Sequence, residues 1–349
     1  MTAKREIPVH GLTEAKGYYK PFRYPWAFEA YVLQAHQMHW VPSEVPMHND
    51  IRDWNFRLSD RERSLLTQLF RFFTTGDVDV GQAYIDKYMP VFQNEEIRMM
   101  LTAFANMESI HAHAYSLLLD TVNMPEVEYQ ASRQYKEMAA KHDYTSSFDV
   151  NDESDVAKAL AVFSAFTEGL QLFSTFAILM SFARGKRPGG AVMTGMNQIV
   201  AMSIRDESAH VEYMTRLFRT FIEERPHLWT SRLKGDLYGI AEAMVALEDD
   251  FIDLAYNEGE TPGLEKDDVK RYIRMIGNRR LNQLGLKSIF KDEYGAVIED
   301  NPLPWLDEMM AGVEHTNFFE NRSTAYSRAT FTGSWTDVWA QPVTSTLSV

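Results

Sequence analysis

The chain has 349 residues, 45% of them hydrophobic, and this length allows one large domain or two ordinary ones. Its 35 Lys and Arg residues against 49 Asp and Glu residues give a formal net charge of −14, which argues against nucleic acid or an anionic membrane as the main partner and is typical of a cytoplasmic protein. Because there is no cysteine, disulfides, thiolate nucleophiles, zinc-thiolate sites and iron–sulfur clusters are excluded, and any metal must be bound by oxygen and nitrogen ligands.

The N-terminal segment, residues 1–25, is polar and aromatic and contains three prolines. This composition predicts an extended arm. The segment also lacks the apolar run of a signal peptide, so none is expected. Apolar residues recur at helical spacing over 26–40, which predicts the first helix, and prolines within 41–46 predict a loop after it.

A capping box marks the start of the next helix. Ser59 is followed three residues later by Glu62, a spacing at which each side chain can bond to the backbone N–H of the other residue. The pattern predicts a long helix over 59–88, with Gly76 and Gly81 as candidate kinks.

The rest of the chain also has helical rather than strand patterns. Its most apolar segment, 159–182, is interrupted by polar residues and does not predict a membrane span, and either Asp152 or Ser154 can cap the helix that contains it. We expect one all-α domain over 26–310 and a flexible Ser/Thr-rich tail over 311–349. Further helices are predicted over 94–120, within 125–149, and over 152–184, 192–221, 231–256 and 266–284.

Two Glu-x-x-His motifs stand out on these helices. Positions i and i+3 share one helix face, so each motif directs a carboxylate and an imidazole at a single point. A third match, 224–227, contains a proline that disfavours a regular helical pair, and it is set aside. The two motifs that remain are Glu108-x-x-His111 and Glu207-x-x-His210.

Each motif follows a helix that carries an acidic residue. Glu168 precedes the second motif, whereas Asp77 and Asp79 compete for this position before the first, since they cannot share a helix face. This order matches a four-helix bundle with a dinuclear carboxylate site. Four carboxylates would repel one another unless cations neutralised them, and mixed carboxylate and imidazole ligands suit iron or manganese. Tyr115 follows His111 by four residues on the same face, so it would be an oxidisable phenol beside the metals.

Together these residues resemble the small, radical-generating subunit of class I ribonucleotide reductase, a ferritin-like family. The resemblance covers about residues 22–335 and rests on the motifs MESIHAHAY at 107–115, EGLQ at 168–171, RDESAH at 205–210 and NPLPW at 301–305. The family pattern places its first carboxylate 31 residues before the first Glu-x-x-His, and this spacing selects Asp77 over Asp79. The resemblance implies a ferritin-like helical bundle with six metal ligands, which are Asp77, Glu108, His111, Glu168, Glu207 and His210.

The same resemblance implies a function. In this family two metal ions, here expected to be iron, with manganese–iron or two manganese ions as alternatives, activate dioxygen and oxidise a tyrosine, here Tyr115, to a stored radical. The radical passes to a separate large subunit, which reduces ribonucleotides to deoxyribonucleotides. The implied relay runs through Trp40, Asp206 and His111 to Tyr326 in the tail, which would dock on the large subunit. A homodimer is also expected.

Two features depart from the family pattern. Phe176 fits the usual apolar cage around the radical, but Leu172 stands where an aromatic residue is common and Ser203 where an aliphatic residue is common. We expect this more polar pocket to alter the lifetime or the hydrogen bonding of the radical. The last residues, 344–349, lack the aromatic-plus-acid ending of some members. The resemblance therefore does not predict how the tail aligns on the large subunit.

Two other functions compete with this interpretation. One is a related ligand-binding oxidase with a di-iron or manganese–iron centre, which would need neither Tyr115 nor Tyr326. The other is a non-catalytic ferritin-like metal-binding bundle, in which Trp40 and Asp206 would have no role. The presence of all four residues favours the reductase subunit.

Overall fold

Helices supply the regular structure of the chain. The computed structural model describes residues 11–311 apart from 19, 74, 258–260 and 262. Within these residues there is no strand, and the strand-like pairings are two isolated bridges, Thr261–Leu264 and Lys291–Val297. The prediction of an all-α fold is therefore confirmed.

The chain divides into two compact units, Met1–Pro304 and Trp305–Val349. In the second unit the described residues, 305–311, are helical. Most of the predicted tail, including Tyr326, and the first ten residues of the predicted arm lie outside the described residues. The predicted boundaries of arm, domain and tail therefore stay predictions.

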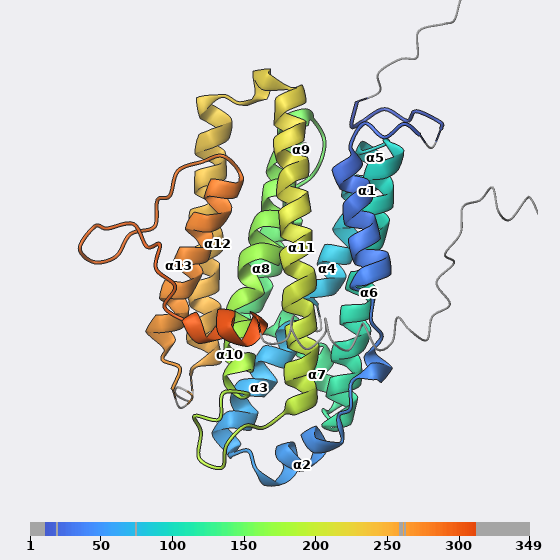
Figure 1. The fold of residues 1–349 in the computed structure, drawn as a ribbon. Helices are drawn as coiled ribbons and strands as arrows, with labels where there is room; N and C mark the ends of the chain where they lie inside the picture. Colours follow the sequence, from blue (N-terminus) through green and yellow to red (C-terminus); the bar gives the residue numbers. More distant parts are fainter. Residues whose placement is uncertain (1–10, 19, 74, 258–260, 262, 312–349) are drawn as a thin grey trace, which may run out of the picture. The chain divides into compact units, whose positions relative to one another are not determined.

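The helical elements of the first unit follow one another with short connections (Figure 1). The elements labelled η are single π-helical or 3-10 segments, of which η1, η3 and η5 are π-helical. In chain order the elements are α1 (Pro25–Val32), η1 (Leu33–Gln37), η2 (Pro42–Glu44), α2 (His48–Phe56), α3 (Asp60–Phe73), α4 (Gly76–Ala83), η3 (Tyr84–Tyr88), α5 (Met89–Val91), α6 (Glu95–Thr121), α7 (Glu126–Tyr129), η4 (Ala131–Gln134), α8 (Lys136–Ser146), α9 (Glu153–Leu160), η5 (Ala161–Gln171), α10 (Phe173–Ser181), α11 (Thr194–Glu224), η6 (Pro226–Leu228), α12 (Ser231–Ala255) and α13 (Lys266–Gln283).

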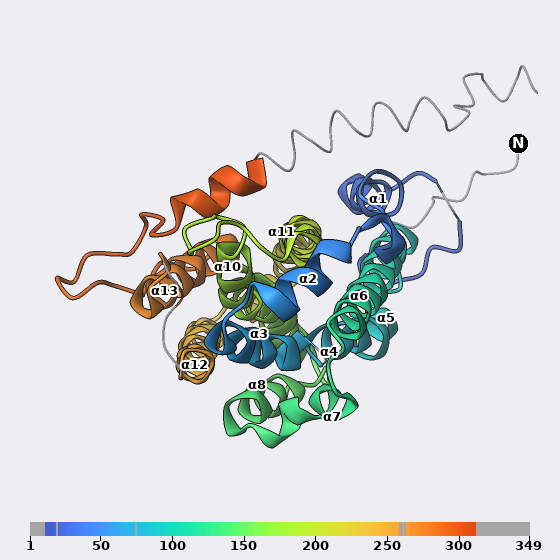
Figure 2. The same ribbon diagram turned by 90° about the horizontal axis from the view of Figure 1, so that it is seen from below.

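Four of these elements form the bundle that positions the site. α4 packs against α6, α6 against α11, α11 against η5, and η5 against α4, so the four close a ring around a shared core. Figure 2 looks nearly along α6 and α11 and shows α4 beside α6. α12 and α13 pack on the outer side of η5. The bundle predicted from two Glu-x-x-His helices and two acidic helices is therefore present.

The predicted helix over 59–88 is interrupted. It begins as predicted, because the Glu62 N–H donates to Ser59 Oγ at 3.3 Å and the Ser59 N–H donates to Glu62 Oε2 at 2.8 Å. α3 then ends at Phe73, and α4 starts at Gly76, where glycine lowers the helix propensity by about 1 kcal/mol. The predicted helix is therefore divided into α3, α4 and η3, and the break between α3 and α4 coincides with the candidate kink at Gly76.

The prediction did not include α2, which follows the proline-containing loop. Its Asp50 carboxylate is fully buried and accepts hydrogen bonds from the backbone N–H groups of Gly195 and Met196, both at 2.8 Å. These are orphan donors in the first turn of α11. A Cβ atom at Gly195 would lie 2.7 Å from Asp50 Oδ2, so glycine permits this close approach. α2 thus fixes the start of the helix that carries the second Glu-x-x-His motif.

Asp152 is the N-cap of α9, which settles the choice between Asp152 and Ser154. Its Oδ1 accepts a hydrogen bond from the Asp155 N–H at 2.8 Å. We predict that Asp152→Ala lowers the free energy of unfolding by about 1 kcal/mol, since an orphan donor at the helix start loses its partner. Denaturant unfolding with Ser154→Ala as the matched control measures the effect. Equal losses in the two variants would contradict the assignment.

One helical run, Glu153–Ser181, is long and apolar enough to span a membrane. The whole of its most apolar window is buried in the structure, as in the core helix of a soluble bundle, which passes the same test. The run is built from α9, η5 and α10, and the π-helical η5 contains Glu168. The π-helical form of η5 was not predicted, because apolar periodicity in the sequence does not distinguish an α-helix from a π-helical segment.

Candidate metal centre

All six predicted ligand side chains lie in the core of the bundle. α4 carries one carboxylate, η5 carries another, and α6 and α11 each carry a carboxylate and an imidazole. No side chain in this set is more than 2% exposed: Asp77, Glu108, His111, Glu168, Glu207 and His210. Charged groups are rarely buried this deeply without partners, so the four carboxylates of this set need opposite charges close to them.

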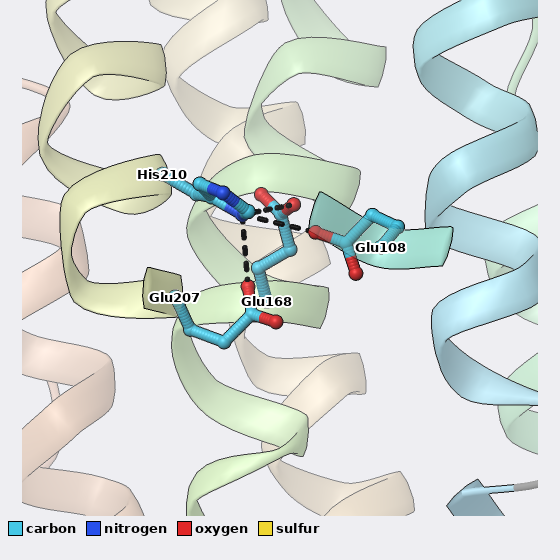
Figure 3. Close-up of side chains that lie close together, drawn as sticks. All are labelled: Glu108, Glu168, Glu207 and His210. Atoms are coloured by element: carbon cyan, nitrogen blue, oxygen red, sulfur yellow. Dashed lines mark ion pairs between the residues drawn. The ribbon is translucent and has the colours of Figure 1, made fainter. Parts of the chain in front are cut away.

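The first group of ligand atoms gathers around His210 (Figure 3). Its Nδ1 lies 3.0 Å from Glu108 Oε1, 3.2 Å from Glu207 Oε2 and 3.6 Å from Glu168 Oε1. One ligand atom from each of these four residues lies within 4.8 Å of the others. Such spacing allows one ion to bind all four residues.

The second group consists of Asp77, Glu108 and His111, whose ligand atoms also lie within 4.8 Å of one another. Nδ1 of His111 lies 3.5 Å from Glu108 Oε2 and 3.1 Å from Glu207 Oε1. Glu108 therefore belongs to both groups, and Glu207 contacts the imidazoles of both. Two adjacent positions that share carboxylates form a dinuclear site.

The oxygen and nitrogen atoms of these six side chains fit metal ions, because many of them are buried without a hydrogen-bond partner. Among the described residues, buried atoms without a hydrogen-bond partner include both carboxylate oxygens of Glu108, Asp77 Oδ2, Glu168 Oε2, Glu207 Oε2 and Nδ1 of both imidazoles. Burial and the charge of Glu108 raise the pKa of Asp77 well above its usual range, and burial raises the pKa of Glu168 to about 8. Cations at the centre would satisfy these atoms and favour the ionised carboxylates.

The sequence competitors of these ligands lie outside the centre. Asp79 forms an ion pair with Nδ1 of His142 on α8 instead. Glu224 accepts a hydrogen bond from the hydroxyl of Tyr24, and α11 ends at this residue before Pro226 begins η6. Neither acidic residue contributes to a group of ligand atoms.

Tyr115 lies one helical turn beyond His111 in α6 and is 3% exposed. Its hydroxyl donates a hydrogen bond to Ser203 Oγ at 3.0 Å, and its ring stacks on Phe73 with the centroids 4.1 Å apart and the planes 6° apart. Burial and the charge of Asp77 raise the pKa of Tyr115 well above its usual range, so the phenol stays protonated at neutral pH. Phe73 was not predicted, because no sequence spacing relates the end of α3 to α6.

A second phenol, Tyr84, lies beside the centre and donates a hydrogen bond to Glu168 Oε1 at 2.7 Å. It follows Asp77 by seven residues, or two helical turns, and this spacing is a signal that could have identified it. Gly81 lies between the two and lets α4 approach α6, since a Cβ atom there would lie 3.1 Å from Glu108 Cβ. Tyr84 therefore orients one of the proposed ligands.

Trp40, Asp206 and His111 form a continuous hydrogen-bonded chain. Trp40 Nε1 donates to Asp206 Oδ2 at 2.8 Å, and the same oxygen lies 3.2 Å from His111 Nε2. Arg205, which was not predicted, donates to the other oxygen, Oδ1, at 2.9 Å. Burial acts to raise the pKa of Asp206, but His111, Arg205 and Trp40 lower it, so the carboxylate stays ionised. The structure thus brings together the three described members of the implied relay.

Known proteins are similar in sequence to this chain over most of its length. The family model described as ribonucleotide reductase, small chain, matches residues 17–302. The chain belongs to the ribonucleotide reductase small-chain family. A relative from Invertebrate iridescent virus 6, named probable ribonucleoside-diphosphate reductase small subunit, is 42% identical over 95% of this chain and 99% of its own length. A ribonucleoside-diphosphate reductase subunit beta from Chlamydia pneumoniae is 30% identical over 88% of this chain and 89% of its own length.

Solved structures of ribonucleotide reductase small chains share the fold. The R2 subunit from Clostridium botulinum covers 86% of this chain and 94% of its own, with a TM-score of 0.77 and 22% identity. The predicted family and ferritin-like bundle are therefore confirmed. As a family member, the chain is the small subunit of a ribonucleoside-diphosphate reductase, an oxidoreductase. This family membership favours the reductase subunit over the competing oxidase and metal-storage functions.

Proposed function

We propose that this chain generates and stores a radical on Tyr115 for use by a ribonucleotide reductase large subunit. The observation that carries the proposal is the group of six buried ligand side chains, whose unpartnered atoms lie within reach of one another beside a buried phenol. A storage bundle has no need of such a phenol or of the hydrogen-bonded chain that leads from His111 to Trp40.

Asp77 and His111 would hold one metal ion, Glu168, Glu207 and His210 would hold the other, and Glu108 would contact both. When bound, the two ions supply the activation of dioxygen and the oxidising power that converts Tyr115 into a radical. We propose two irons, with manganese–iron or two manganese ions as alternatives that the same oxygen and nitrogen ligands accept. A structural neighbour from Streptococcus sanguinis, with a TM-score of 0.67 and 21% identity, is described as a dimanganese(II) protein.

The chain's own residues protect and connect the radical site. Tyr115 is buried against Phe73, which keeps water and reductants from the phenol ring. Asp206 accepts from Trp40 and lies beside His111, so it holds the indole in a fixed position next to the centre. We propose that this chain of contacts is the inner part of a relay that continues to Tyr326, which lies outside the described residues.

The proposed partners are the large subunit and a second copy of this chain. We propose neither nucleic acid nor a membrane as a partner. α4 exposes Val78, and the adjoining η3 exposes Ile85, at 54% and 57%, and this apolar face supports a homodimer. The tail over 311–349 would dock on the large subunit in the cytoplasm.

Metal binding by metal-free protein tests the proposal. Anaerobic titration with ferrous iron is expected to give two ions per chain, and Glu108→Gln is expected to weaken binding by more than about 100-fold, since a direct ligand is lost. Asp79→Asn is the matched control and should keep both ions. Calorimetry and metal analysis provide the measurement, and one ion per chain in the unsubstituted protein would contradict a dinuclear centre.

Oxygen exposure of the iron-loaded protein then tests the radical. Electron paramagnetic resonance should show a tyrosyl doublet, and a large subunit should then reduce ribonucleoside diphosphates. A coupled metal signal without an organic radical, and without activity on adding a large subunit, would favour the oxidase function instead.

A further inference from the structure

A hydroxyl group faces the phenol that we propose as the radical site. Ser203, on α11, is 1% exposed and accepts the hydrogen bond from the Tyr115 hydroxyl at 3.0 Å. Within the described residues this is the only hydrogen bond made by either hydroxyl. The Tyr115 oxygen therefore has one protein partner, which comes from α11, the helix packed beside its own.

Ser203 differs from other hydroxyl residues of the long helices. Ser208 and Thr215 on α11, and Ser109 on α6, donate to the carbonyl oxygen of the fourth preceding residue, as hydroxyl groups within helices often do. Ser203 makes no such bond to the described part of the chain, so its own proton is not committed to the backbone. A hydroxyl can both donate and accept, and rotation about its C–O bond exchanges the two roles.

We propose that Ser203 donates a hydrogen bond to the oxygen of oxidised Tyr115, which reverses the direction of the bond in the reduced protein. The inference rests on the proposed function of Tyr115. On oxidation the phenolic O–H bond of Tyr115 would break, and the metal-loaded centre would supply the oxidant that takes the electron and the base that takes the proton. Ser203 keeps its own O–H bond, and the phenoxyl oxygen, which can only accept, becomes its partner.

The surroundings strengthen this interaction. Phe73 covers one face of the Tyr115 ring, and Phe176 lies 5.9 Å from Phe73. Tyr115 and Ser203 are buried, and away from water a hydrogen bond is stronger and an unpartnered acceptor is correspondingly unfavourable. Ser203 therefore makes this a hydrogen-bonded tyrosyl radical, whereas an aliphatic residue at this position would leave the oxygen without a partner.

High-field electron paramagnetic resonance of the full-length, iron-loaded protein tests the inference. A hydrogen bond to the phenoxyl oxygen lowers the g1 component of the spectrum and, in D2O, adds a coupling from an exchangeable deuteron. The unsubstituted protein is expected to show both features, and Ser203→Ala is expected to raise g1 and lose the deuteron coupling. Ser203→Thr keeps the hydroxyl and should restore both. Thr215→Val removes a buried hydroxyl elsewhere on α11 and should change neither.

Deuteron coupling that persists in Ser203→Ala would overturn the inference, because water or another group would then be the donor. An unsubstituted protein that shows no exchangeable coupling would overturn it as well. If Ser203→Ala forms no radical, Ser203→Cys replaces it, since a thiol donates weakly, and an unchanged g1 in that variant overturns the inference. Absence of any tyrosyl radical in both the unsubstituted protein and Thr215→Val would instead contradict the proposed function.

Discussion

Tyr115→Phe is expected to abolish the stored radical completely and to lower reductase activity with a large subunit by at least about three orders of magnitude. Phenylalanine keeps the ring that stacks on Phe73 but has no O–H bond to break. None of the six proposed ligands is changed, so the protein should still bind two metal ions. Ser203 loses its partner, which costs about 1 kcal/mol of stability and leaves the fold intact. Electron paramagnetic resonance and metal analysis on the same sample measure both results.

Tyr84→Phe is the matched control for this prediction. Both phenols are buried beside the centre, but the Tyr84 hydroxyl donates a hydrogen bond to Glu168, whereas the Tyr115 hydroxyl donates one to Ser203. Tyr84→Phe should therefore keep the radical doublet, even if the loss of its hydrogen bond alters metal affinity. A doublet that survives in Tyr115→Phe and disappears in Tyr84→Phe would move the radical to the second phenol.

Local spacing accounts for most of what the sequence predicted about the site. A Glu-x-x-His motif fixes two side chains on one helix face whatever the rest of the fold does, so Glu108 with His111 and Glu207 with His210 could be paired from their spacing alone. The choice of Asp77 over Asp79 needed the family spacing, because both residues lie on the same short helix. The structure buries Asp77 and pairs Asp79 with His142, in agreement with that choice.

Contacts between distant segments were beyond the reach of the sequence. Phe73, at the end of α3, stacks on Tyr115 of α6, and no spacing along the chain indicates that these two helices meet there. A glycine in a helical pattern indicates a kink without giving its direction. The prolines before α2 predicted a loop, and α2 itself was not predicted. Its residue Asp50 caps the start of α11, a contact between segments that are far apart in the sequence. The polar character of Ser203 could be recognised from the sequence, but its hydrogen bond to Tyr115 depends on how α6 and α11 pack.

Trp40→Phe is expected to separate storage of the radical from its use. The substitution removes the Nε1–H that donates to Asp206 at 2.8 Å and replaces indole by a ring that is harder to oxidise. It leaves the ligands and Tyr115 in place, so the radical signal should persist. Turnover with a large subunit should fall on the order of 100-fold, because a fixed partner of the centre is lost. Trp54→Phe, which alters an indole stacked on Phe70, is the matched control and should keep full activity.

Asp206→Asn tests the same relay at the residue between Trp40 and His111. Trp40 and His111 face Asp206 Oδ2, and Arg205 donates to Oδ1, so the two carboxylate oxygens serve three partners. An amide offers one oxygen, and its NH2 group would face a donor on whichever side it lies. We therefore expect activity to fall at least as far as in Trp40→Phe, with weaker metal binding as well because His111 loses its anionic partner. Full turnover in both variants, with a normal radical signal, would show that the radical passes from Tyr115 to the large subunit by a route that does not include Trp40.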